Sequence, residues 1–165
     1  MVHVDNMNDE PSQRRFAALR RLTQVWIDPP IFFLTVCVQA RRQLLAHEVV
    51  HAILREVWET GYQRHGWQVG RYVIMPDHVH LFCAASRQAA SLGTYVGAWK
   101  QWSSKLLRGR TGMTDFQWQR NFFDHVLRSE ESYQGKWHYV MNNPVRAGLV
   151  RNAVEWPYAG HLHFL

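Results

Sequence analysis

The pattern of apolar and polar positions along the chain predicts a domain built from strands and helices. Runs rich in β-branched and aromatic residues predict strands over residues 31–39, 67–76 and 78–85, with two shorter ones inside 116–128. Apolar residues at helical spacing, with charged residues between them, predict helices over 46–65, 89–110 and 129–145. We therefore expect an α+β sandwich in which helices pack against a mostly antiparallel sheet.

Local details of this pattern predict pairing and burial. The short connection at Pro76 and Asp77 favours an antiparallel pair between the strands on either side of it. Val49 and Ile53 are placed on the apolar stripe of the first helix, and Tyr95 on that of the second. These three side chains are expected to face the core.

The last predicted helix holds one aromatic residue that its apolar stripe does not explain. At about 100° per residue, Tyr133 and Val140 fall on the apolar side, whereas Tyr139 lies nearly opposite, on a face with Lys136 and Asn143. Two interpretations remain open at this point. Tyr139 covers a neighbouring loop, or its hydroxyl serves as a nucleophile.

Composition narrows the choice of partners. The 165 residues include 19 lysines and arginines against 13 aspartates and glutamates, a formal charge of +6, and 47% are hydrophobic, enough for the core of one domain. All but three of the basic residues are arginines, whose planar fork suits phosphate oxygens and guanine edges. This balance favours a polyanionic partner, with nucleic acid as the leading candidate.

The first 28 residues differ from the rest of the chain. They begin with a polar, unpatterned stretch and continue with "RRFAALRRL", in which arginines alternate with apolar residues. Pro29 and Pro30 then end any helix. We expect a flexible basic arm over 1–28, with Arg14 and Arg15 as candidate contacts to nucleic acid, and a single catalytic domain over 29–165.

The sequence does not resemble that of a membrane or disulfide-linked protein. Its longest apolar stretch, near "IFFLTVCV", is far shorter than a membrane span, and the N-terminal residues lack the apolar core of a signal peptide. Cys37 and Cys83 lie within apolar runs at no metal-binding spacing, so we expect both to be reduced core residues. The expected compartment is the cytoplasm.

Candidate chemistry begins in the stretch "MPDHVHLF". Because side chains alternate along a strand, His78 and His80 leave the same face, where two neutral imidazoles can hold a metal ion. Chance alone gives about 0.6 such pairs for ten histidines in a chain of this length, so the spacing needs support from elsewhere.

Two other histidine pairs are weaker candidates. His161 and His163 lie near the C-terminal end, where we expect fraying and no fixed geometry. His47 and His51 are four residues apart on the first predicted helix, but no third ligand is evident, so we expect them on a solvated face.

Tyr139 has suitable neighbours for phosphodiester chemistry. A tyrosine hydroxyl can attack a phosphodiester if the hydroxyl loses its proton and a metal withdraws charge from the phosphate. Lys136, one turn earlier, can favour the phenolate, and Asn143, at i+4, can give an amide oxygen to the same metal.

Four ordered motifs, "MPDHVHLF", "FQWQRNFFDHVLR", "YVMNNPVRAGLV" and "EWPY", resemble those of the REP-associated tyrosine transposases, relatives of the HUH single-strand transposases. The resemblance extends from about Phe32 to Tyr158. It implies a ferredoxin-like α+β domain, the HUH nuclease fold, that nicks and rejoins single-stranded DNA near repetitive extragenic palindromes.

The resemblance also assigns roles to residues. His78 and His80 match the metal-binding pair, Tyr139 the nucleophile, and Asn143 the polar residue that completes the metal site. The implied cofactor is Mg²⁺ or Mn²⁺, the implied product a 5′-phosphotyrosine, and the implied partner single-stranded and hairpin DNA, met in the bacterial nucleoid by a monomer or homodimer. Candidate DNA contacts are Arg14, Arg15, Trp118, Gln119, Arg120, Lys136 and Arg146.

The same residues suggest two alternatives to this function. A domesticated protein that recognises REP hairpins without cutting them would share the basic, aromatic surface. A histidine-triad nucleotide hydrolase would need a further histidine where Phe82 stands, and is disfavoured.

Overall fold

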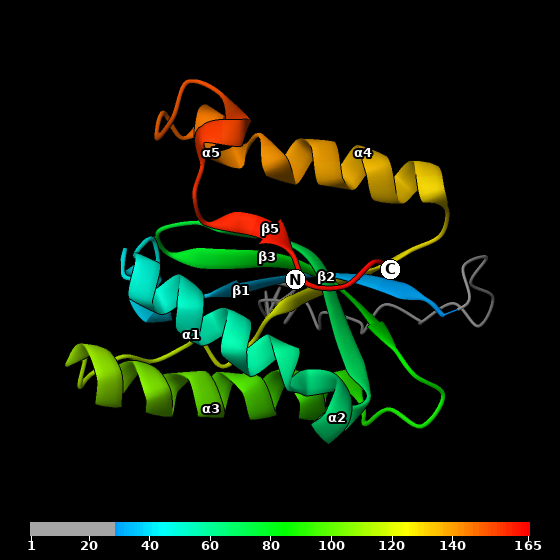
Figure 1. Cartoon of the computed structure of the whole chain (residues 1–165), viewed down its shortest axis with the longest axis horizontal. Coiled ribbons are helices and arrows are strands. Elements are labelled where there is room, and N and C mark those ends of the chain that lie inside the picture. Colours follow the sequence, from blue (N-terminus) through cyan, green and yellow to red (C-terminus); the bar gives the residue numbers. More distant parts are fainter. Residues whose placement is uncertain (1–28) are drawn as a thin grey trace, which may run out of the picture.

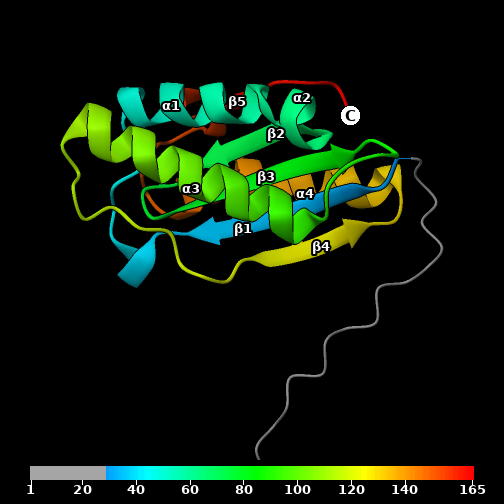
Figure 2. The same ribbon diagram turned by 90° about the horizontal axis from the view of Figure 1, so that it is seen from below.

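The computed structural model describes residues 29–165, which form a five-stranded antiparallel sheet with helices on both faces (Figure 1 and Figure 2). The predicted contacts of Arg14 and Arg15, and the predicted arm over 1–28, lie outside these residues. The elements, in chain order, are β1 (Ile31–Cys37), η1 (Gln39–Arg41), α1 (Glu48–Glu59), α2 (Gly61–His65), β2 (Trp67–Ile74), β3 (His78–Ala85), α3 (Leu92–Thr111), β4 (Phe123–Leu127), α4 (Glu130–Met141), α5 (Asn143–Arg146), η2 (Ala153–Glu155) and β5 (Ala159–His161).

The strands lie in the order β4-β1-β3-β2-β5, so β3 occupies the centre of the sheet. β2 and β3 pair directly across the turn at Pro76 and Asp77, as the short connection predicted. The expected α+β sandwich with a mostly antiparallel sheet is confirmed. Of the two strands expected within 116–128, β4 forms, whereas the earlier run contributes only an isolated bridge between Val38 and Trp118.

The helices divide between the two faces of the sheet. α1, α2 and α3 cover one face, and α4 lies across the other, above the sheet in Figure 1 and behind it in Figure 2. The larger core cluster lies under α1 and α3 and includes Leu34, Trp58 and Leu81. A smaller cluster lies under α4, where the rings of Phe82 and Tyr133 meet edge to face with centroids 5.0 Å apart.

The predicted helix over 46–65 differs from the structure in its stripe and its length. The buried positions of α1 are Val50, Ile53, Leu54, Val57 and Trp58. They follow the full i, i+3, i+4, i+7, i+8 pattern of a helix that packs on one side. Val49 falls off this stripe and is 52% exposed, so its predicted core position is wrong. The helix is also interrupted: α1 ends at Glu59, and a separate helix, α2, begins at Gly61.

The ends of α4 follow from its sequence. The Ser129 hydroxyl accepts a hydrogen bond from the backbone N–H of Ser132. Glu130 and Glu131 lie in the first turn, where acidic side chains interact favourably with the helix dipole. α4 ends at Met141, and a short helix, α5, begins at Asn143 just before Pro144. The sequence predicted an end or a bend at this position.

The segment after residue 158 does not fray, and this expectation from the sequence is wrong. β5 pairs with the edge of β2, and the pairing is extended by backbone hydrogen bonds from Leu162 to Gly70 and from His163 to Val69, both 3.1 Å long. The reason is tertiary: an edge strand offers unpaired backbone groups that a passing segment can satisfy. Among the described residues, no helix combines the length and the apolar character that crossing a membrane requires.

Candidate functional site

The His-x-His pair lies on the central strand, on the face covered by α4. Alternation along β3 turns Val79 and Leu81 into the larger core and places His78 and His80 on the same face as Phe82. The Nε2 atoms of His78 and His80 lie 3.1 Å apart. The structure therefore brings both imidazoles of the predicted pair to one point.

Each imidazole is oriented by a hydrogen bond at its other nitrogen. Nδ1 of His78 lies 2.6 Å from the Asp77 carboxylate, and Nδ1 of His80 lies 2.8 Å from the Thr35 hydroxyl on β1. Asp77 also pairs with Arg41 at 2.7 Å. Such partners fix the ring orientation and leave Nε2 free to act as a ligand.

Burial holds both histidines in the neutral form that a metal requires. Burial lowers the pKa of His78, although the neighbouring Asp77 opposes the shift. Burial, followed by the charges of His78 and Arg41, lowers the pKa of His80 to about 3. At neutral pH neither ring therefore carries the extra proton of an imidazolium, which a metal would have to displace.

The spacing of these nitrogens suits an octahedral cation. Adjacent ligands on an ion with bonds of about 2.1 Å lie about 3.0 Å apart, close to the 3.1 Å between the two Nε2 atoms. Within residues 29–165, no three His, Cys, Asp or Glu side chains gather into a metal site. The amide oxygen of Asn143, the third ligand that the sequence suggests, stays a prediction.

Three successive contacts, which pass through Phe33 and Lys136, connect Tyr139 to the histidine pair. The Phe33 ring stacks on His80, with centroids 5.4 Å apart and planes inclined by 23°. The Lys136 ammonium lies 5.1 Å from the centroid of Phe33 and 6.0 Å from that of Tyr139. Tyr139 itself is 59% exposed, as its place on the polar helical face predicted.

Arg146 joins Tyr139 to Asn143. Its guanidinium carbon lies 3.9 Å from the centroid of the Tyr139 ring, and its Nη1 donates a 2.9 Å hydrogen bond to the Tyr139 carbonyl. The guanidinium also donates to Oδ1 of Asn143. Because an amide oxygen has two lone pairs, this bond leaves one available to a metal.

Trp118 lies in the core, so the structure does not support its predicted contact with DNA. It is 8% exposed, packs edge to face against Trp99 and Phe116, and donates a 2.9 Å hydrogen bond from Nε1 to the Ser103 hydroxyl. Little ring surface remains for stacking on a base. The reason is the bridge between Trp118 and Val38, which turns the indole under the sheet.

The residues after Trp118 form a loop whose backbone is fixed by hydrogen bonds to Cys37 and Lys100. The backbone N–H of Gln119 donates a 2.8 Å hydrogen bond to the Cys37 carbonyl. The Lys100 ammonium binds the carbonyls of Gln119, Arg120 and Asn121 at 2.9, 3.1 and 3.3 Å. The Arg120 side chain is exposed. DNA contacts by Gln119 and Arg120 stay predictions.

Two further sequence expectations need correction. His51 is half-buried and shares a 2.8 Å hydrogen bond with the Tyr72 hydroxyl, so only His47 lies on a solvated face. Cys83 is a reduced core residue, as predicted, but Cys37 is partly exposed and accepts a 2.7 Å hydrogen bond from Arg41. Cys37 lies opposite His78 in the β1–β3 register, on the histidine face rather than in the larger core.

Sequence reasoning missed the residues that orient the histidines. Asp77 is adjacent to His78, and its carboxylate was a visible signal in "MPDHVHLF". Thr35 is 45 residues from His80 and becomes its neighbour only through the register of β1 on β3. No local pattern identifies that contact.

Known proteins resemble this chain over most of its length. The family model described as "Transposase IS200 like" matches residues 32–143. The REP-associated tyrosine transposase of Escherichia coli (strain K12) is 25% identical over 132 residues, which cover 78% of this chain and 74% of the relative. A Haemophilus influenzae protein is 21% identical over 138 residues, 78% of each chain.

Solved structures share the fold. A REP-associated tyrosine transposase bound to a REP hairpin superposes with a TM-score of 0.64 at 21% identity, covering 86% of this chain and 82% of its own. The resemblance of the sequence motifs to the REP-associated tyrosine transposases is thereby confirmed. With a family match over most of the described domain, the chain belongs to the IS200-like transposase family.

Proposed function

We propose that this protein is a metal-dependent endonuclease and strand transferase that acts on single-stranded and hairpin DNA of the REP type. The observation that carries the proposal is the pair of Nε2 atoms of His78 and His80, 3.1 Å apart, on the sheet face over which α4 presents Tyr139. The relative bound to a REP hairpin supports DNA of this kind as the substrate.

The residues around the pair suit a phosphodiester. The charged groups of Lys136 and Arg146 lie 6.0 and 3.9 Å from the centroid of the Tyr139 ring, so two positive charges adjoin that ring. Cations so placed attract the DNA backbone. His78, His80 and Asn143 would hold Mg²⁺ or Mn²⁺, which when bound polarises the scissile phosphate.

The reaction follows from the nucleophile. The Tyr139 oxygen attacks the phosphorus, a new O–P bond forms, and the bond from phosphorus to the 3′ oxygen breaks. The phenol proton leaves to water, since Tyr139 is exposed, and the departing 3′ oxygen takes a proton from water. The products are a 5′-phosphotyrosine and a free 3′-OH. Attack by a second 3′-OH on the same link rejoins a strand without any nucleotide cofactor.

A hairpin-binding protein without cleavage activity is the second candidate. It is favoured by one observation: Arg146 covers the Tyr139 ring and is bonded to Asn143, so both reactive residues have partners within the chain. The two functions predict the same affinity for DNA and differ only in covalent chemistry.

The deciding experiment looks for the covalent link. A hairpin oligonucleotide labelled at its 3′ end is incubated with Mn²⁺ and resolved on a denaturing gel. The wild-type protein should retain the 3′ label and release the 5′ portion with a free 3′-OH, and EDTA should prevent both.

Matched variants identify the nucleophile. Tyr139→Phe removes one exposed oxygen, so it should lose the adduct while its melting temperature and hairpin affinity stay near those of the wild type. Tyr133→Phe makes the same change on the buried side of α4 and should keep the adduct. Hairpin binding with no adduct from any REP hairpin would favour the non-cleaving candidate.

A further inference from the structure

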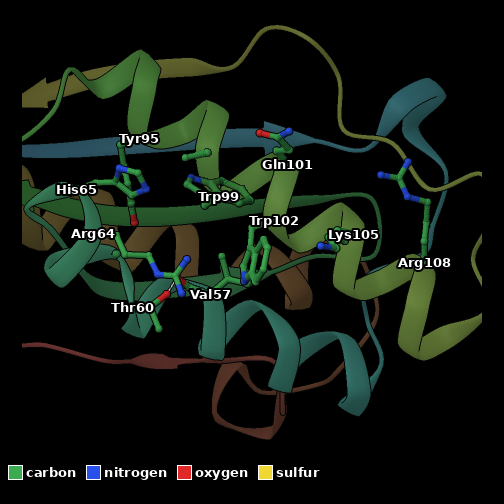
Figure 3. Close-up of a pocket in the computed structure, with 12 residues that line it drawn as sticks. Val57, Thr60, Arg64, His65, Tyr95, Trp99, Gln101, Trp102, Lys105 and Arg108 are labelled. Carbon is green, nitrogen blue, oxygen red and sulfur yellow. Dashed lines mark hydrogen bonds between the residues drawn. The ribbon is translucent and has the colours of Figure 1, made fainter.

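A pocket of about 510 Å³ lies on the sheet face opposite the histidine pair, between α2 and α3 (Figure 3). We propose that it binds a nucleotide through both its base and its phosphate, supplied either by an unpaired position in a DNA strand or by a free nucleotide. The volume falls within the range of small-ligand sites. The site does not depend on cleavage and would exist in a protein that never uses Tyr139 as a nucleophile.

The rim of this pocket carries uncompensated positive charge. Arg64, Lys105 and Arg108 line it, and no carboxylate among residues 29–165 does. Within residues 29–165 none of these three forms an ion pair, whereas the nearby Arg55 and Arg110 are paired with glutamates on α1. Glutamates of α1 thus neutralise Arg55 and Arg110, whereas the three basic side chains that line the pocket are available to an anion.

An exposed tryptophan supplies a surface for a base. Trp102 is 38% exposed, and its ring centroid lies 5.5 Å from the guanidinium carbon of Arg64 and 5.1 Å from the Lys105 ammonium. Figure 3 shows Trp102 facing Arg64 across the pocket. An indole flanked by cations can stack a base while its neighbours hold the attached phosphate.

Two residues that line the pocket each carry a buried polar atom. The Tyr95 hydroxyl and Nε1 of Trp99 have no hydrogen-bond partner within residues 29–165. Tyr95 is fully buried and Trp99 is 2% exposed. An indole N–H can only donate, so the missing partner carries an acceptor, such as the carbonyl oxygen of a base.

Gly61 keeps the space above Tyr95 open. A Cβ at this position would lie 3.0 Å from Cε2 of Tyr95 and 3.2 Å from its hydroxyl oxygen. The glycine has an ordinary negative φ, so backbone conformation does not require it. Its absence of a side chain matters for the pocket, which Gly61 lines.

These features together select the ligand class. An inorganic anion would use the rim and leave Trp102 and the two buried polar atoms without partners. An apolar molecule would leave the cations and both buried polar atoms unsatisfied. A nucleotide engages the rim with its phosphate, Trp102 with its base and the two buried polar atoms with its carbonyl groups.

Photo-cross-linking gives a direct test. A short single strand that contains 5-iodouracil is irradiated with the full-length Tyr139→Phe protein, and cross-linked peptides are mapped by mass spectrometry. Cross-links on the α3 peptide containing Trp99 and Trp102 are expected. Cross-links confined to peptides of β3, α4 and α5 would rule out a DNA strand as the source of the nucleotide.

Affinity measurements on matched variants complete the test. Trp102→Leu and Arg64→Gln should each weaken binding of the strand, or of dTMP and dGMP, about tenfold. Tyr62→Leu and Arg151→Gln remove an exposed aromatic and an exposed arginine outside the pocket and should leave it unchanged.

Comparing the single strand with the mononucleotides distinguishes the two sources of the nucleotide. Pocket-dependent binding of the strand assigns the site to DNA, and pocket-dependent binding of mononucleotides alone assigns it to a free nucleotide. Equal affinity of the wild type and both pocket variants for every probe would overturn the proposal. The adduct assay on wild-type protein is scored separately, so failure of cleavage and failure of this pocket are distinguishable.

Discussion

The guanidinium of Arg146 lies over the ring of Tyr139, with its central carbon 3.9 Å from the ring centroid. The same group bonds the Tyr139 carbonyl and the Asn143 amide oxygen. Residues that the sequence suggested as a DNA contact, a nucleophile and a metal ligand therefore form one contiguous unit at the junction of α4 and α5.

Replacing Arg146 should impair this unit without unfolding the protein. Lys keeps the charge but lacks the planar fork that reaches two acceptors at once. We expect both Arg146→Lys and Arg146→Ala to slow single-turnover adduct formation about tenfold, equivalent to about 1.4 kcal/mol, with little change in melting temperature because Arg146 is exposed. If Arg146→Lys reacts at the wild-type rate, only the charge matters.

The histidine pair should be needed for cleavage but not for DNA binding. His78→Ala or His80→Ala removes a ligand, whereas affinity rests mainly on cation–phosphate contacts. We expect no adduct with Mn²⁺ and nearly normal gel shifts of a hairpin. His161→Ala changes an exposed histidine on β5 and serves as the control that cuts normally. Normal cleavage by His78→Ala would place the metal elsewhere.

Thr35 should tune metal affinity rather than chemistry. Thr35→Val keeps the shape of the side chain and removes the hydroxyl that orients His80. Loss of such a partner weakens metal binding about 10- to 100-fold, which a Mn²⁺ titration followed by electron paramagnetic resonance measures. Cleavage should recover at saturating Mn²⁺. Thr111→Val removes a hydroxyl at the far end of α3 and should alter neither quantity.

Trp118 should contribute to stability through its buried hydrogen bond. Ser103→Ala leaves Nε1 of Trp118 buried without its acceptor, and we expect a loss of about 1–3 kcal/mol in the free energy of unfolding. Urea denaturation measures this loss, and hairpin affinity measured in parallel should not change. A stable Ser103→Ala protein with weakened DNA binding would restore Trp118 as a DNA contact.

His51 should make stability depend on pH. Burial, followed by the charge of Arg55, lowers its pKa below the ordinary value of 6.5. The folded state therefore holds His51 neutral while the unfolded state takes up a proton, so this contribution is present above about pH 6.5 and is lost as the pH falls below it. The drop in unfolding free energy from pH 7.5 to 5.5 should be smaller in His51→Gln than in the wild type. Equal drops would show that His51 is not involved.

The sequence predicts those features that depend on local periodicity. Alternation alone places His78 and His80 on one face, and helical spacing alone leaves Tyr139 exposed. The turn at Pro76 and Asp77 correctly predicts the pairing of β2 with β3. Each of these rests on neighbours within about one turn of helix or one hairpin.

Features that depend on distant partners were not predictable in this way. The sequence suggests an exposed Trp118, but the bridge to Val38 turns this residue inward. Thr35 has no distinguishing local pattern, and only the register of β1 on β3 brings it to His80. Local pattern predicts fraying after Tyr158 because the partner of this segment, the edge of β2, lies about 90 residues earlier, as the pairing of Arg71 with His161 shows. Tertiary pairing overrides local pattern at all three places.

The pairing of β5 on β2 has a consequence for solubility. Without β5, β2 would present a row of free backbone N–H and C=O groups at the border of the sheet, and such a row is a template for intermolecular strand addition and aggregation. Three residues of β5, extended by two further backbone hydrogen bonds, occupy that template from within the same chain. This short segment, which has no evident part in chemistry, thus removes the border of β2 as a site of strand addition.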